Sequence, residues 1–126
     1  MKAWLYAILG LIIFIALSFL NQWFLEKNTH GLTIHLEQVE KAIQSKKWDE
    51  AGRGLQSIQK KWRKIKPVWS LLLHHQEIDA IDQALIRTVK AVQSKDDTTS
   101  RVEQGSLANY IEHIPKREKF SLVNIL

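Results

Sequence analysis

A long apolar run lies close to the start of the chain. Residues 3–20 read AWLYAILGLIIFIALSFL and contain no charged side chain. A run of about eighteen such residues is long enough to cross the hydrocarbon core of a bilayer as a helix. Trp4 lies at the start of the run and Trp23 just after its end, and tryptophan rings favour the headgroup regions at the two membrane surfaces. We therefore expect residues 1–27 to form a transmembrane anchor and residues 28–126 to form a separate domain.

A cleaved signal peptide is the alternative for the same segment. Lys2 would supply its positive start, and Ala16 and Ser18 offer a small-x-small cleavage site. The apolar run is longer than the hydrophobic part of an ordinary signal peptide, which favours an uncleaved anchor. The lysine beside a short N-terminal tail favours a cytoplasmic N-terminus. We expect a single-pass protein of the cell membrane with its domain on the extracytoplasmic side.

The remainder of the chain has the periodicity of helices. Apolar residues recur every three or four positions, as on one face of a helix. Two such stripes comprise Leu32, Leu36, Val39 and Ile43, then Trp48, Ala51, Leu55, Ile58, Trp62 and Ile65. Helices are expected at about residues 30–46, 48–64, 67–93 and 99–114. Pro67 and Pro115 are expected to separate elements, because proline lacks an amide proton and clashes inside a helix.

No alternation typical of strands competes with this periodicity. The predicted fold class is all-α, with an N-terminal transmembrane helix followed by an up-and-down antiparallel bundle of three to four helices. The chain has no cysteine, which excludes disulfides and thiolate metal sites. Its closing segment, SLVNIL at residues 121–126, is apolar and is expected to dock on the bundle.

Basic and aromatic residues alternate in the segment KKWRKIKPVWS, residues 60–70. The segment belongs to the basic part of the chain, since residues 26–66 carry a net charge of +5 and residues 67–126 a net charge of −1. If the helix over residues 48–64 returns antiparallel to its predecessor, this end arrives beside Leu25, where the chain leaves the bilayer. Each Lys or Arg there would add about 1 kcal/mol of attraction to anionic lipid. The residues expected at the membrane surface are Lys60, Lys61, Trp62, Arg63, Lys64, Lys66 and Trp69.

Two other interpretations of this segment remain. Trp62 also belongs to an apolar stripe and is therefore expected in the core, whereas Trp69 fits either environment. Basic and aromatic residues together also suit single-stranded nucleic acid. An extracytoplasmic domain would not meet nucleic acid, so no such partner is expected. Lys116, Arg117 and Lys119 should lie at the same end of the bundle as residues 60–66.

A second polar group lies around residue 75. His75 and Asp79 are four residues apart and can share a helix face, and the candidate network comprises His75, Glu77, Asp79 and Asp82. Zinc needs three or four ligands, and no second cluster completes a set, so no metal is expected. A histidine bonded to a carboxylate would titrate near neutral pH. No phosphate loop and no nucleophile beside a base is present, so neither an enzyme nor a cofactor is expected.

Four segments occur in a characteristic order: WDEA at residues 48–51, KKWRKIKPVW at 60–69, HQEIDAID at 75–82 and the closing SLVNIL. Together they resemble the bacterial domain-of-unknown-function family 4363 over nearly the whole chain. The resemblance implies a small single-anchor membrane protein of Firmicutes, associated with membrane proteins encoded nearby. Gly52, Gly54 and Gln76 depart from the family pattern.

The expected function follows from the anchor and the bundle. We expect a non-catalytic docking or accessory subunit for another membrane protein or for a second copy of the chain, held on an anionic lipid surface. The alternative is a pH- or ligand-responsive sensor bundle centred on His75.

Overall fold

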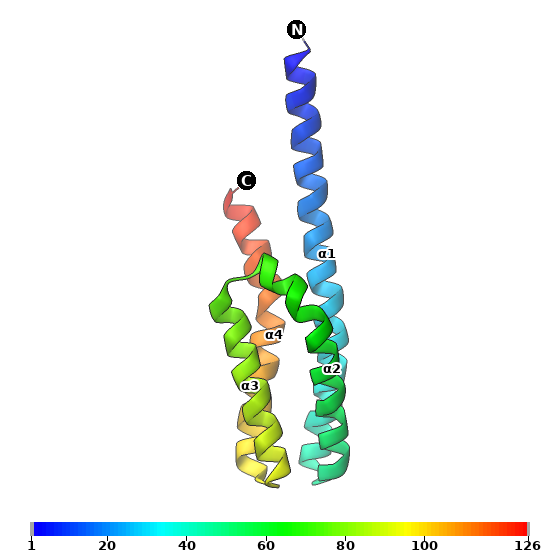
Figure 1. Ribbon diagram of the computed structural model, residues 1–126, viewed down its shortest axis with the longest axis vertical. Helices are drawn as coiled ribbons and strands as arrows, with labels where there is room; N and C mark the ends of the chain where they lie inside the picture. Colours follow the sequence, from blue (N-terminus) through cyan, green and yellow to red (C-terminus); the bar gives the residue numbers. More distant parts are fainter. Residues whose placement is uncertain (1, 126) are drawn as a thin grey trace.

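The fold consists of four α-helices. The computed structural model describes the backbone of residues 2–125 and the side chains of residues 2–114. The helices are α1 (Ala3–Gln44), α2 (Trp48–Leu72), α3 (His75–Gln93) and α4 (Asp97–Ile125), shown in Figure 1. No strand occurs among residues 2–125. The predicted all-α class is therefore confirmed.

The helices form an up-and-down antiparallel bundle. α1 packs against α2 and α4, and α3 packs against α4 and, less extensively, against α2. The N-terminal part of α1 extends well beyond the other three helices (Figure 1). The structure thus has the predicted arrangement of a long apolar N-terminal helix followed by a helical bundle. The first helix of the bundle is the second half of α1.

α1 joins the apolar segment to the bundle without a break. Its most apolar stretch has no buried side chain, whereas Leu25 and Leu32 have no exposed surface at all. The helix expected at residues 30–46 is therefore a continuation of the apolar helix. No interruption of α1 marks the boundary expected after Lys27, since residues 20–30 keep helical geometry throughout.

The core is made of the apolar stripes that the sequence shows. Leu36 and Val39 of α1, Ile58 of α2 and Ile81 of α3 are almost fully buried, and α4 adds Leu107. Full burial of one such side chain is worth about 1.5–3 kcal/mol. These contacts close the bundle along its length. A buried polar contact crosses the same core, because the side-chain amide of Gln104 donates to the carbonyl oxygen of Leu36 over 3.1 Å.

The two hairpin turns at the far end of the bundle are built alike. After α1, the N–H of Lys46 donates to the carbonyl of Ile43 over 3.0 Å, and that of Lys47 donates to Ala42 over 2.8 Å. These two bonds define a Schellman motif, which needs a left-handed residue and usually has glycine there. Lys46 takes that position with a φ of 56°, and Lys95 takes the equivalent position after α3 with the same φ.

Pro67 does not begin a helix, contrary to the sequence prediction. It lies inside α2, which continues to Leu72. Proline removes one backbone hydrogen bond and kinks a helix, and Figure 1 shows α2 bending toward α3 over its last turns. Burial of Trp69 and Leu73 stabilises the continuation of the helix past the proline.

Pro115 does not end α4 either, because this helix continues to Ile125. Residues 116–119 read KREK and are good helix formers, which favours helix on the C-terminal side of the proline. The backbone of this last part lies on the side of the bundle from which α1 rises (Figure 1). The structure describes side chains only for residues 2–114. The expected docking of SLVNIL and the expected place of the Lys116, Arg117 and Lys119 side chains fall outside this range.

Candidate functional site

The basic segment lies on α2 at the end of the bundle from which the apolar half of α1 rises (Figure 1). Lys61 reaches α1 there, since its ammonium nitrogen would be 3.7 Å from a β-carbon placed on Gly31. Lys60, Arg63 and Lys64 are also exposed. Because α2 runs antiparallel to α1, these charges lie close to the place where the apolar part of α1 enters the bundle. Their contact with lipid stays a prediction.

The two tryptophans of this segment are core residues. Trp62 is 4% exposed and Trp69 is fully buried. Their ring centroids are 5.6 Å apart at an interplanar angle of 78°, which is the favoured edge-to-face geometry. The two residues are two helical turns apart and so share one face of α2. The core position of Trp62 is confirmed, and the expectation that both rings lie at headgroups is corrected.

Asp82 joins the basic segment to α3. The indole N–H of Trp62 donates to Asp82 Oδ1 over 2.6 Å, and the Lys66 ammonium donates to Asp82 Oδ2 over 2.7 Å. The carboxylate is about three-quarters buried, whereas Lys66 is more exposed. Both oxygens of Asp82 thus hold α2 against α3. Lys66 is used in this contact and is less available to lipid than its neighbours.

The four polar residues on α3 do not form one network. His75 and Asp79 are exposed, Asp82 faces α2, and Glu77 lines a cleft toward α4. The reason is the helical period, since positions 77 and 82 differ by about 500° of rotation, or about 140° on the helix wheel. The buried stripe of α3 begins at Ile78, and His75, one turn before it, is exposed. This placement gives the sensor hypothesis no support.

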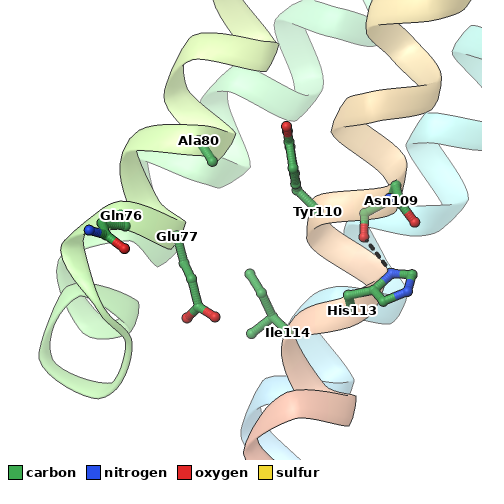
Figure 2. A pocket seen from close by; sticks show the side chains of 7 residues that line it. All are labelled: Gln76, Glu77, Ala80, Asn109, Tyr110, His113 and Ile114. Atoms are coloured by element: carbon green, nitrogen blue, oxygen red, sulfur yellow. Dashed lines mark hydrogen bonds between the residues drawn. The ribbon is translucent and has the colours of Figure 1, made fainter.

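A cleft of about 210 Å³ separates the start of α3 from α4. Figure 2 shows it with its lining residues, which are Gln76, Glu77, Ala80, Asn109, Tyr110, His113 and Ile114. Nδ1 of His113 is 2.8 Å from the carbonyl oxygen of Asn109. A carbonyl can only accept, so Nδ1 carries the proton. Sequence reasoning did not bring Glu77 and His113 together, because their proximity depends on the register of α4 against α3.

A larger groove of about 570 Å³ runs between α2 and α3 near the hairpin turns. Trp48 and Val89 form a half-buried apolar floor. The buried Leu55 and Val92 and the backbone at Gly52 also line the groove. The remaining lining side chains are polar or charged, namely Asp49, Arg53, Gln56, Gln59, Gln93 and Lys95. No sequence signal marks this groove, because it arises from the limited packing of α2 on α3. No group of three metal-ligating side chains converges within the described residues.

These features define a class of protein, a helical bundle with an exposed apolar extension. Among the described residues, one helix is long and apolar enough to cross a membrane. The chain belongs to the DUF4363 family, a domain of unknown function, whose family model matches residues 19–125. The match begins inside the apolar part of α1 and includes both segments that meet at Asp82. The suspected family is confirmed. No curated protein and no solved structure matches the chain.

Proposed function

We propose that the protein is a single-pass membrane protein whose bundle is a docking or accessory subunit for another membrane protein and carries out no chemistry itself. The observation that supports this proposal is the continuity of α1, which is uncovered over its apolar half and packed into the bundle from Leu25 onward. A helix without a linker holds the bundle at a fixed height above the bilayer. Such an arrangement suits positioning of a partner.

The groove between α2 and α3 is the proposed docking face. Its apolar floor at Trp48 and Val89 and its polar rim match the way in which amphipathic helices lie in grooves. Around it, Lys46, Lys47, Arg53 and Lys95 outnumber Asp49 and Glu50. The proposed occupant is therefore a helical segment of another membrane protein with one apolar face and acidic flanks. The bundle and this segment would lie on the extracytoplasmic side.

Site-specific photo-crosslinking of the full chain in its own membranes tests this role. A crosslinker at Gln56, an exposed residue of the groove, should capture one reproducible membrane protein. The matched control is the exposed Val102 on α4, which should not capture it. Capture of a second copy at Gln56 would replace the accessory role by self-association. Equal yields at both positions, or none, would refute the docking face.

The anchor itself is tested by intact mass and by extraction. The uncleaved chain has a mass of 14.7 kDa, and it should remain with the membrane after alkaline carbonate washing. A shorter product that is released by the wash would establish a cleaved leader and would remove the membrane from the proposal.

A further inference from the structure

The C-terminal corner of α2 exposes three apolar side chains. Val68, Leu71 and Leu72 are 41%, 86% and 39% exposed, while Trp69 and Leu73 beside them are buried. We call the three exposed residues the apolar corner. The helix is bent after Pro67, and its last turns cross over the end of the bundle (Figure 1). The bend therefore presents one face of these turns to the core and the other outward.

Contiguous exposed apolar side chains on a folded protein mark sites that another surface covers. The place of the apolar corner indicates which surface this is. It lies at the end of the bundle where the uncovered half of α1 begins (Figure 1). In the middle of α1, just before its buried part begins at Leu25, the exposed Trp23 has the Lys27 ammonium 5.0 Å from its ring centroid. A tryptophan paired with a lysine is typical of the headgroup region.

Charge complements this apolar surface. The exposed Lys60, Lys61, Arg63 and Lys64 form a basic row on α2 one to three turns before the apolar corner. Along the axis of the bundle, the basic row lies farther from the apolar half of α1 than the apolar corner does, because α2 runs toward that half. Segments that lie in a bilayer interface place apolar side chains at the acyl boundary and basic side chains at the headgroups.

We propose that the apolar corner inserts into the interfacial layer of the bilayer that α1 spans, while the basic row binds anionic headgroups. This inference rests on the proposed membrane anchoring. It gives the bundle two attachments to one membrane, the α1 helix and the α2–α3 junction. Two attachments fix the tilt of the bundle as well as its height. In this proposal Val68, Leu71 and Leu72 contact the lipid, whereas the rings of Trp62 and Trp69 stay buried in the core.

The absence of cysteine from the chain allows a direct test with single-cysteine variants. Leu71→Cys, Val102→Cys and Ile12→Cys replace exposed side chains and should leave the fold intact. Each full-length variant is labelled with an environment-sensitive fluorophore and placed in vesicles of phosphatidylcholine and phosphatidylglycerol. Lipids that carry a quencher near the headgroup or deep in the acyl chain then report the depth of each label.

The expected pattern differs at the three positions. The label at Leu71 should be quenched most by the shallow quencher, that at Ile12 by the deep one, and that at Val102 by neither. Loss of quenching at Leu71 with deep quenching at Ile12 would overturn the apolar corner and leave the anchor in place. Loss of quenching at Ile12 would overturn the anchor and the inference together.

Vesicles of phosphatidylcholine alone test the basic row. Quenching at Leu71 should fall severalfold without anionic lipid, and replacement of Lys60, Lys61, Arg63 and Lys64 by glutamine should produce the same fall in mixed vesicles. Equal quenching in both lipids and in the glutamine variant would remove the basic row from the proposal.

Discussion

Two glycines near the start of α2 offer a test of how closely α1 and α2 pack. A β-carbon at Gly54 would lie 2.7 Å from Cγ2 of Val39, whereas one at Gly52 would have no described atom within 4 Å. Alanine at either position gains about 1 kcal/mol of helix propensity. Gly52→Ala should therefore stabilise the bundle by about 0.5–1 kcal/mol. The same substitution at Gly54 meets a second effect.

Val39 cannot easily yield to a methyl group at position 54. Its side chain is 1% exposed, and a β-branched residue in a helix has one strongly preferred rotamer. Insertion of a methyl group into such a packed site costs about 1–3 kcal/mol. After the propensity gain, Gly54→Ala should destabilise the bundle by about 0–2 kcal/mol. The two alanine variants should thus differ by about 1–3 kcal/mol.

Urea unfolding of the full chain in detergent micelles, followed by circular dichroism, measures this difference. In a thermal scan, 1 kcal/mol corresponds to a Tm shift of about 4–8 °C for a domain of this size. Val39→Ala removes the obstructing methyl, so the double variant should be more stable than the sum of the two single effects, by about 1–3 kcal/mol. Equal stabilisation by both alanines, or additivity in the double variant, would refute close approach as the reason for glycine at position 54.

Substitutions at three further positions test the junction and the hairpin turns by the same unfolding assay. Asp82→Ala should cost about 1–3 kcal/mol because it leaves the Trp62 indole N–H without its acceptor, whereas Asp82→Asn, which keeps an acceptor, should cost less. Lys46→Gly should stabilise by about 1 kcal/mol because glycine adopts the left-handed conformation without steric cost, and Lys46→Ala should give no such gain. The backbone amide of Thr99, with the larger effect, and its hydroxyl both donate hydrogen bonds to the Asp96 carboxylate and lower the pKa of this group below its ordinary value of 3.8. The stability that these bonds contribute is therefore complete above pH 3.8 and is lost as the pH falls through the lower folded-state pKa. The stability difference between the wild type and Asp96→Ala should accordingly shrink from neutral pH to about pH 2, and a difference independent of pH would contradict this role.

The apolar stripes predicted most of the bundle because helical periodicity is a local property of the sequence. The stripe residues that lie in the core as expected are Leu32, Leu36, Val39, Ile43, Ala51, Leu55, Ile58 and Trp62. Trp48 and Ile65 are only partly buried at its edge. The turn after Gln44 is where the first stripe stops. The prolines were misinterpreted because their cost is also local. Burial of Trp69 and Leu73 beyond Pro67 depends on tertiary packing, which local sequence rules do not predict.

The candidate site was less predictable for the same reason. Proximity in sequence grouped Glu77 with Asp82, but their helix turns them toward different neighbours. Asp82 accepts a hydrogen bond from Trp62 on α2, whereas Glu77 lines a cleft with His113 of α4, and both placements depend on the register between helices. That register is set by side-chain packing along the whole bundle. The exposed Leu71 was missed because the sequence reasoning assigned Pro67 to the start of a helix.

The continuity of α1 also couples the orientation of its apolar half to that of the bundle. An α-helix turns by about 100° and rises 1.5 Å per residue. One residue inserted between Leu20 and Leu25 would therefore swing the α2–α3 groove through about 100° around the axis of the span, while the bundle would rise by only about 1.5 Å. Seven inserted residues would restore the direction of the groove and lift it by about 10 Å. In the proposed membrane-anchored state, a neighbour in contact with the apolar half of α1 would thus determine the direction in which the groove of the bundle faces.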